Sequence, residues 1–353
     1  VIMIVASYVN YHRIVRLGWG WFWLLAAVAI IAALKTPLAH SELGATRWIK
    51  LGPVSFQAAE PIKAAIIIFF AYYVSYWGLN RWYNQVLACL LAIALLGFLF
   101  FFSNNLSTVI VLFCICAVII LSSVKKPDLY WYFLLGLALI IIAAIFVTVY
   151  LLMHQGAENF RFVRIRAWLH PEEYAADEGL QAMQARYAIG AGGFWGKGLG
   201  QSLIKFKLSY SYNDFILAII CEELGVFGVI VMMTLFGYLL YRIYKIAQNA
   251  WDIEGKVLAI GVFTQIALQL LINVMVVTSV IPTTGVTLPF FSAGGTSVVF
   301  LLAELGMVLN VDKYAKERRF FEEAERHVAQ MEQRGGIGAA GWRRRLDSAR
   351  TRR

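Results

Sequence analysis

Long apolar runs separated by short polar segments extend over most of the chain. A membrane-spanning helix needs about 17 or more predominantly apolar residues. Candidate spans lie near residues 17–38, 61–78, 86–102, 106–122, 129–153, 214–241, 257–277 and 293–311. An apolar stub at 1–9 resembles the end of a further span. The pattern predicts an all-α, polytopic membrane bundle of eight complete spans plus this stub.

Composition agrees with a membrane environment. Of 353 residues, 60% are hydrophobic and only 15% are charged, more apolar surface than a water-soluble chain of this length can bury. Alternate connections between the spans are basic, and basic connections stay on the cytoplasmic side. They carry Arg13, Arg16, Arg81, Lys125, Lys126, Arg242, Lys245 and Lys256. We therefore expect a cytoplasmic C-terminus and a large outer loop at 154–213.

Two domains are expected, a membrane domain at 1–314 and a basic tail at 315–353. The tail begins with apolar residues at helical spacing among many charges and ends in GWRRRLDSARTRR. This composition indicates a short amphipathic helix and a basic end that meets anionic membrane lipid. A nucleic-acid partner is not expected.

The outer loop contains a glycine-rich stretch, GAGGFWGKGLGQS at 190–202. A Walker phosphate loop would require Gly at 191 and Ser or Thr at 198, where the chain has Ala191 and Gly198. ATP-driven transport is therefore not predicted. A tightly turned loop is the simpler interpretation. The alternative is that Lys197 and exposed backbone N–H groups hold an anion.

Two charged residues stand at the start of the 61–78 span. Glu60 and Lys63 are three residues apart and share one helix face. They would form a local ion pair at the interface, with Lys63 extending outward, or Lys63 would be a cation held at the outer rim of a cavity. Ionisable residues at membrane depth usually face a cavity or a partner.

Three acids lie in the segment SYNDFILAIICEEL. Asp214 is predicted either as the N-cap of the next span, a role open also to Asn213, or as a functional carboxylate at the outer surface. Glu222 and Glu223 are turned by about 80° and 180° from Asp214 around a straight helix, so the three cannot line one site. A structural role, bonded to neighbouring helices, is favoured for the Glu pair.

Four motifs, in order, resemble those of the SEDS family (RodA, FtsW and SpoVE), the peptidoglycan polymerases of bacterial membranes. They are GATRWIKLGPVSFQAAEPIK (44–63), YAIGAGGFWGKGLGQS (187–202), NDFILAIICEELGVFG (213–228) and LPFFSAGGTS (288–297). The likeness extends to about residue 314 and is nearer to FtsW or SpoVE than to RodA. The family has ten spans with both ends cytoplasmic, so the first span and most of the second would be absent here.

The resemblance implies a glycosyltransferase that moves disaccharide units between lipid II molecules during division, elongation or sporulation. Asp214 matches the family's essential aspartate and would be the catalytic base. Substrate-binding residues expected within the motifs are Arg47, Glu60, Lys63, Lys197, Gln201, Ser202 and Ser292. No resident cofactor or metal-ligand set is expected, and a divalent cation at the pyrophosphate is left open.

The resemblance also implies a class B penicillin-binding protein as partner and the bacterial inner membrane as location. A lipid II flippase and a non-catalytic scaffold for a transpeptidase are the alternative functions. The chain departs from the family pattern at two places. Ala58-Ala59 replaces Pro-Ser, and Leu208-Ser209-Tyr210 replaces Leu-Pro-Glu, which puts the loop's shape and the role of a second acid in doubt.

Overall fold

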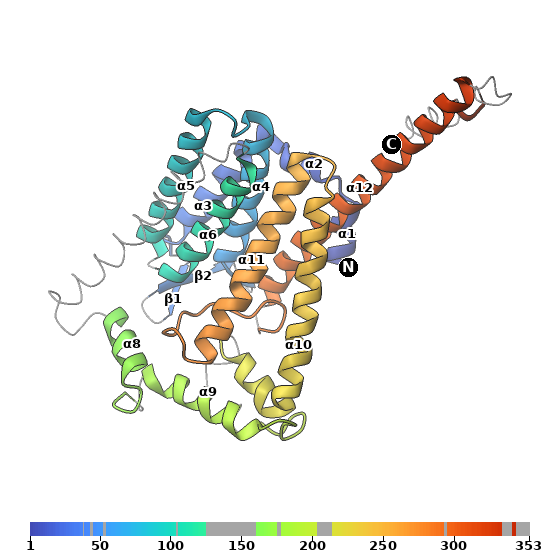
Figure 1. Ribbon diagram of the computed structural model, residues 1–353. Coiled ribbons are helices and arrows are strands. Elements are labelled where there is room, and N and C mark those ends of the chain that lie inside the picture. The colour runs from blue at the N-terminus through green and yellow to red at the C-terminus, as the bar shows by residue number, and fades with distance from the viewer. Residues whose placement is uncertain are drawn as a thin grey trace.

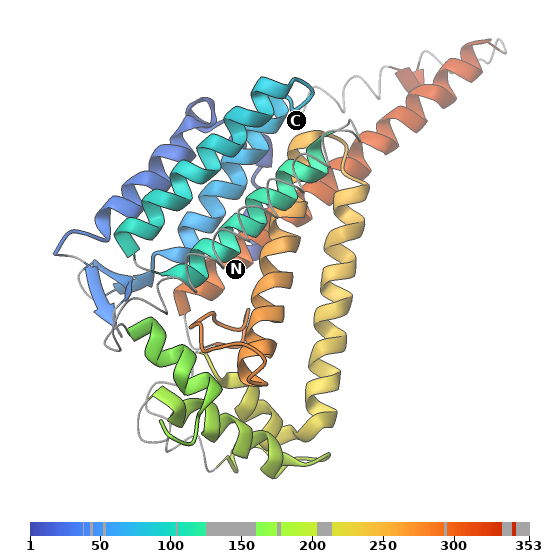
Figure 2. The same ribbon diagram turned by 60° about the vertical axis from the view of Figure 1, so that its left-hand side comes forward.

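The computed structural model is a bundle of long helices, with the two shorter helices of residues 160–192 lying across one end (Figures 1 and 2). The structure describes residues 1–37, 39–42, 45–51, 54–103, 105–124, 160–174, 178–202, 214–292, 295–333 and 341–343. The span expected near 129–153, and the parts of the outer loop at 154–159 and 203–213, lie outside these residues.

The predicted polytopic helical class is confirmed. The described helices are α1 (Ile2–Tyr8), α2 (Tyr11–Val15), α3 (Trp21–Ala33), α4 (Ala59–Trp77), α5 (Trp82–Ser103), α6 (Leu106–Ser123), α8 (Phe160–Leu169), α9 (Glu178–Gly192), α10 (Ile216–Gln248), α11 (Ile253–Val277) and α12 (Gly295–Gln333), with a 3-10 turn η1 at Leu17–Gly20. Within the described ranges, five helices are long and apolar enough to cross a membrane: α5, α6, α10, α11 and α12.

Helix α4 occupies the centre of the bundle. It packs against α3, α6, α11 and α12, and nearly all of its residues from Glu60 to Val74 are buried. A helix that is apolar on all sides is stable only when neighbours surround it. Its contact with α11 is close at Gly261, where an added Cβ would lie 2.6 Å from Ile67 Cγ2. The site residues at the start of α4 are therefore held by a helix that is buried on nearly all sides.

A three-stranded antiparallel sheet precedes α4, which an all-α prediction does not include. Its strands, in sheet order, are β1 (Ala39–Glu42), β2 (Ala45–Leu51) and β3 (Val54–Gln57). Trp48 lies opposite both His40 and Gln57. Aromatic and β-branched residues alternate along β2 and β3, the composition that favours strands. The sheet leads the chain from the end of α3 into the first turn of α4.

Helix α10 is interrupted by a kink at Gly225, whose φ of 69° and ψ of −173° are not helical. The glycine-rich segment after α9 pairs with the interrupted backbone. Four backbone hydrogen bonds join them: Lys197 N–H to Glu222 O (2.9 Å), Gly198 N–H to Glu223 O (2.9 Å), Val226 N–H to Gly193 O (3.0 Å) and Phe227 N–H to Phe194 O (3.1 Å). The polar groups that the kink exposes are thus satisfied inside the protein, as a membrane helix requires.

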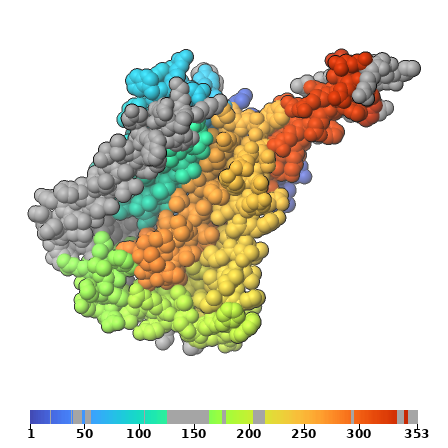
Figure 3. Space-filling model, viewed as in Figure 1, coloured from blue at the N-terminus to red at the C-terminus, as the bar shows by residue number. Residues whose placement is uncertain are grey.

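This pairing decides between the two interpretations of the glycine-rich stretch. The tightly turned loop is confirmed. The alternative in which backbone N–H groups hold an anion is wrong for Lys197 and Gly198, because both donate to α10. Figure 3 shows α8 and α9 covering the end of the bundle formed by α10 and α11.

At the opposite end of the bundle, α2 contacts the start of α11. Asp252 is the N-cap of α11 and accepts a hydrogen bond from Gly255 N–H (2.7 Å). Tyr11 O–H donates to the same carboxylate (2.8 Å). Burial alone would raise the pKa of Asp252, but hydrogen bonds from His12, Gly255 and Tyr11 hold that pKa below its ordinary value. Asp252 is therefore a charged residue in a partly buried contact.

Helix α12 runs without a break past residue 314, where the sequence suggests that the membrane domain ends, and projects beyond the bundle (Figure 1). The C-terminal part of this helix carries the charged, amphipathic stretch expected for the tail. The expected boundary at residue 314 thus falls inside one continuous helix.

The kink yields a stability prediction. A side chain at 225 would place Cβ 2.3 Å from Phe194 O and 2.4 Å from Gly196 N, at a φ that L-residues rarely adopt. We expect Gly225→Ala to destabilise the protein by about 3 kcal/mol or more, since a clash with backbone adds to the strain. Thermal unfolding in detergent measures this. Gly237→Ala in the same helix meets open space and should have little effect; equal losses in the two variants would contradict the pairing.

Candidate functional site

An ion pair buried in the first turn of α4 forms the centre of the site. Lys63 Nζ lies 2.8 Å from Glu60 Oε1, and the two side chains are only 4% and 3% exposed. The predicted i, i+3 pair is confirmed. The idea that Lys63 extends outward is wrong, because the lysine is enclosed by the bundle. Removing both charges from water is costly, so the surroundings must supply further polar contacts.

A stripe of buried amides on α11 supplies polar groups beside this pair. Gln265, Gln269 and Asn273 are spaced by four residues and therefore share one face of the helix. Gln265 Nε2 donates to Glu304 Oε2 of α12 (2.9 Å). At the other end of the stripe, Asn273 Nδ2 donates to the backbone oxygen of Asp214 (2.9 Å). The stripe runs from a buried acid inside the bundle to the candidate catalytic acid.

A small cavity lies between the ion pair and the amide stripe. It has a volume of about 20 Å³ and is lined by Glu60, Lys63 and Gln269 together with residues of the loop before α12. Glu60 Oε2 and Gln269 Oε1 accept no hydrogen bond from the described residues. A cavity of this size holds about one water molecule, and its lining is polar enough to bind one.

Asp214 precedes α10 by two residues, and it is linked to the amide stripe through Asn273. Its side chain is partly exposed, and its backbone is fixed by Asn273, which also donates to Val286 O of the cavity wall (3.0 Å). Helix α10 begins at Ile216 with Phe215 at the N-cap position. The N-cap prediction is therefore wrong for Asp214, and Asn213 lies outside the described residues. A partly exposed carboxylate on a fixed backbone suits a general base.

A second polar cluster surrounds Glu222 on the kinked part of α10. The Glu222 side chain is 1% exposed and lies 2.8 Å from Lys197 Nζ, while Ser202 Oγ donates to its other oxygen (2.5 Å). A structural role for Glu222 is confirmed, and two of its partners, Lys197 and Ser202, come from the glycine-rich segment. Lys197 and Ser202 are thus brought together. Gln201 beside them is exposed.

Two candidates remain, Arg47 and Ser292. Arg47 lies between α3 and α4, and Ser292 lies between α11 and α12. Arg47 is in β2, and its side chain is outside the described part of the structure. Ser292 closes a turn before α12, since its Oγ accepts Leu288 N–H (2.7 Å) and its N–H donates to Leu288 O (3.2 Å). No contact between described residues joins Ser292 to the Glu60–Lys63 pair.

Sequence reasoning missed four buried polar residues, Glu304 and the three amides of α11. Glu304 stands in the apolar run VVFLLAELG, and an acid in such a run is by itself a signal of function or pairing. The amides carry no charge and become noticeable only through their four-residue spacing. Their importance follows from the partners that the fold gives them.

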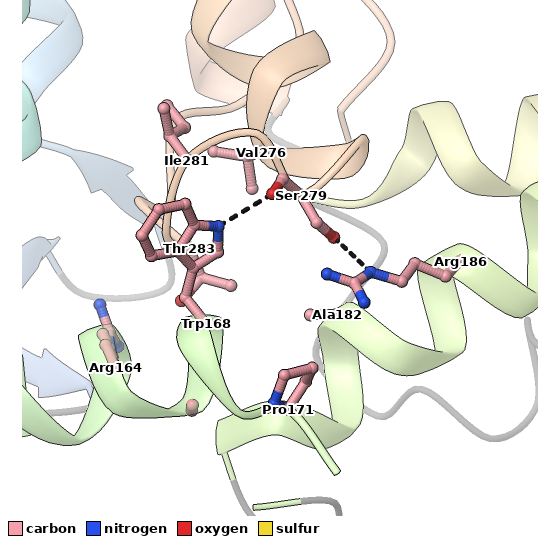
Figure 4. Close-up of a pocket in the computed structure, with 10 residues that line it drawn as sticks. Arg164, Trp168, Pro171, Ala182, Arg186, Val276, Ser279, Ile281 and Thr283 are labelled. Carbon is pink, nitrogen blue, oxygen red and sulfur yellow. Dashed lines mark hydrogen bonds between the residues drawn. The ribbon is translucent and has the colours of Figure 1, made fainter.

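Helices α8 and α9 are anchored on the turn that follows α11. Trp168 Nε1 of α8 donates to Ser279 O (2.8 Å), and Arg186 Nε of α9 donates to Ser279 Oγ (3.0 Å). Ser279 has a φ of 58°, unusual for a residue with a side chain, and the bonds hold it in that conformation. Figure 4 shows these residues around a small cavity that also includes Arg164.

These features define a class: multi-pass helical membrane proteins with a buried, charged site at one end of the bundle. The chain belongs to the FtsW/RodA/SpoVE family, whose model, described as cell cycle protein, matches residues 1–317. The family prediction is confirmed.

The chain is similar to several curated relatives. It is 34% identical to the probable peptidoglycan glycosyltransferase FtsW of Trichlorobacter lovleyi over 293 residues, 81% of this chain and 74% of that protein. It is 45% identical to stage V sporulation protein E of Bacillus subtilis over 158 residues, 44% of this chain and 43% of that protein.

Two solved structures share the fold. One belongs to a study of how a peptidoglycan synthase complex coordinates polymerization and crosslinking; it has a TM-score of 0.70 at 24% identity, covering 88% of this chain and 85% of its own. The rod shape determining protein RodA of Thermus thermophilus has a TM-score of 0.61 at 23% identity, covering 88% and 83%.

The buried ion pair predicts strong coupling between its two residues. Lys63→Met leaves Glu60 charged and without its partner, and Glu60→Gln does the same to Lys63, so each should cost about 3–5 kcal/mol. The double variant should recover much of that loss, because neither charge remains. Thermal unfolding of all four proteins gives the coupling, and additive losses would show that the pair contributes nothing as a pair.

The Glu222 cluster gives a matched pair of variants on adjacent residues. Glu222→Gln removes the charge that faces Lys197 and should lower stability by about 1–3 kcal/mol. Glu223→Gln changes a more exposed side chain and should stay within about 0.5 kcal/mol of wild type. Thermal unfolding measures both changes. A larger loss in Glu223→Gln would mean that the wrong acid has been assigned to the structural role.

Proposed function

We propose that this chain is a peptidoglycan glycosyltransferase that transfers disaccharide units from one lipid II molecule to another to extend glycan strands. The curated relatives named probable peptidoglycan glycosyltransferase FtsW support the reaction class. The observation that carries the proposal is the position of Asp214, partly exposed and with its backbone held by Asn273 of the amide stripe, whose neighbour Gln269 lines the cavity at Glu60 and Lys63.

The chemistry requires a base and no nucleotide. The anomeric carbon of the donor carries a lipid pyrophosphate, a leaving group that is already activated. A hydroxyl oxygen of the acceptor sugar attacks that carbon, its proton passes to the Asp214 carboxylate, and the carbon–oxygen bond to the pyrophosphate breaks with its electron pair leaving on oxygen. A sugar hydroxyl is a weak nucleophile at neutral pH, which is why a positioned carboxylate accelerates the step.

The departing pyrophosphate needs positive charge, for which Arg47, Lys63 and Lys197 are our candidates. Of the two lysines among these candidates, Lys197 is the more accessible, with 32% of its side chain exposed against 4% for Lys63. We propose that Lys63 acts mainly by holding Glu60 and the polar cavity in place. Gln201, Ser202 and Ser292 remain proposed substrate contacts.

A divalent cation at the pyrophosphate receives no protein ligands in this proposal. Within the described ranges, the group of His, Cys, Asp or Glu side chains close enough to share an ion is His12, Asp252 and Glu254, and it lies at the opposite end of the bundle.

We further propose that the protein resides in the bacterial inner membrane, with its C-terminus in the cytoplasm and residues 154–213 outside. The basic connections between spans support this orientation. We propose a class B penicillin-binding protein as partner, supported by the likeness to a chain from a peptidoglycan synthase complex. Membrane lipid surrounds the apolar faces.

Buried charges are also compatible with a flippase for the same lipid. The cavity beside Glu60 and Lys63 has about 20 Å³ and is far smaller than a sugar headgroup, so transport through it would need a large rearrangement. A polymerase that works at the outer mouth needs no such change, and this favours the polymerase over the flippase. A scaffold would need no buried charged site at all.

The test is glycan synthesis by the full-length protein, purified with its transpeptidase partner and supplied with labelled lipid II while crosslinking is blocked. We expect Asp214→Asn to reduce strand formation by about 10²–10⁴-fold, because Asn keeps the shape of the side chain but cannot accept the proton. Strands are resolved on a gel, and thermal unfolding checks that the variant is folded.

Three other outcomes would count against parts of the proposal. Equal strands from wild type and Asp214→Asn would move the base to another residue. Lipid II transport that survives in Asp214→Asn, with no strands from either protein, would favour the flippase. Growth and partner binding unaffected by Asp214→Asn would favour the scaffold.

A further inference from the structure

Three side chains from distant parts of the sequence converge at the end of the bundle opposite Asp214. His12 belongs to α2, whereas Asp252 and Glu254 stand at the start of α11 (Figure 1). His12 Nε2 lies 2.6 Å from Asp252 Oδ2 and 3.8 Å from Glu254 Oε2. The three ligand atoms all lie within 4.8 Å of one another.

Both carboxylates turn one oxygen toward His12. Asp252 Oδ1 accepts Gly255 N–H, while Oδ2 accepts Tyr11 O–H (2.8 Å) and faces the imidazole. Glu254 Oε1 accepts hydrogen bonds from Arg16 and Ser75, both at 3.0 Å. Glu254 Oε2 accepts none from the described residues, although the side chain is only 4% exposed. A buried carboxylate oxygen without a donor is costly and indicates a missing partner.

The orientation of His12 indicates what kind of partner is missing. Asn10 Oδ1 accepts the backbone N–H of His12 (3.0 Å), and this bond fixes the Asn10 amide with its oxygen toward His12. The same oxygen lies 2.9 Å from His12 Nδ1, so Nδ1 carries the hydrogen. Nε2 then faces two carboxylate oxygens, at 2.6 and 3.8 Å. This approach is favourable only with a positive charge between them, either a proton on Nε2 or a metal ion.

We propose that His12, Asp252 and Glu254 bind one divalent metal ion of the zinc class, through Nε2 and one oxygen of each carboxylate. Zn²⁺ is held by nitrogen and oxygen at about 2.0–2.2 Å, so tetrahedral ligands stand about 3.3 Å apart. The distance from His12 Nε2 to Asp252 Oδ2 (2.6 Å) is shorter than this value, and the distance to Glu254 Oε2 (3.8 Å) is longer. Small rotations of the three side chains would bring their ligand atoms to the tetrahedral separation.

The mixed ligand set selects among metals. Mg²⁺ and Ca²⁺ prefer sites made of oxygen alone, whereas imidazole favours zinc and its transition-metal neighbours. The His12 and Asp252 side chains are 17% and 26% exposed, so a water molecule can reach the ion and complete its fourth position. Asn10 holds the imidazole by its other nitrogen, the usual arrangement around a metal-bound histidine.

An ion at this place would join three parts of the chain. It would tie α2 to the start of α11, and the His12 ring packs edge-on against Tyr314 of α12 at 4.8 Å. Asn310 of α12 also accepts Tyr11 N–H (3.1 Å). The metal would therefore stabilise the meeting point of the N-terminal segment with two long helices, because a site that forms only in the folded state adds its binding free energy to stability.

The test is metal binding by the full-length protein in detergent, prepared with an affinity tag that contains no histidine and stripped with EDTA. Zn²⁺ is titrated in competition with a chromophoric chelator. We expect one ion per chain in wild type, and affinity weaker by at least about tenfold in His12→Ala and in Glu254→Gln. His170→Ala, in the exposed turn after α8, is the matched control and should bind as wild type does.

Thermal unfolding gives a second measurement that does not depend on activity. Saturating Zn²⁺ should raise the Tm of wild type and of His170→Ala but leave Glu254→Gln unchanged, since an ion stabilises only the protein that binds it. Glu254→Gln keeps the size and the Arg16 and Ser75 contacts of Glu254, so it should fold even if His12→Ala does not.

Two results would overturn the proposal. If the stripped wild type binds no stoichiometric Zn²⁺, the group between His12 and the carboxylates is a proton, and the cluster is an imidazolium ion pair. If Glu254→Gln binds Zn²⁺ and gains Tm as wild type does, the ion is held by other residues.

Discussion

Buried carboxylates in an apolar bundle constrain the packing of this protein more than any other feature. Taken from water, a charge without a partner costs several kcal/mol, so each acid must meet a donor as the helices assemble. Glu60 meets Lys63 within α4, Glu222 meets Lys197 of the glycine-rich segment, and Glu304 meets Gln265 of α11. Two of these three partners come from another segment. The acids therefore help to determine which segments lie together.

The kink in α10 shows the same constraint at the level of the backbone. Breaking a helix exposes N–H and C=O groups that the bilayer cannot satisfy. The glycine-rich segment supplies the missing hydrogen bonds. Gly196 of that segment and Gly225 of α10 let the two backbones approach so closely that a Cβ atom at either position would collide with the other backbone. Because Lys197 and Ser202 come from the same segment, one interaction fixes both the kink and the buried acid.

Much of the candidate site could be predicted from the sequence, and some of it could not. Acids and lysines inside apolar runs are visible without a structure, which is how Glu60, Lys63 and Asp214 were found. Gln269 and Asn273 were missed because neutral amides are unremarkable until their neighbours are known. The cap assigned to Asp214 failed because α10 begins two residues later, and helix boundaries depend on contacts beyond local propensity.

The sequence alone determined the membrane class, the family and the identity of the charged residues, since long apolar runs and ordered motifs are local properties of the chain. Tertiary structure alone decided the partners. It turned Lys63 inward, gave the backbone N–H groups of Lys197 and Gly198 to α10, and brought His12 to Asp252 and Glu254 from 240 and 242 positions away. Which charges meet is set by the packing of whole helices, and no local pattern encodes that.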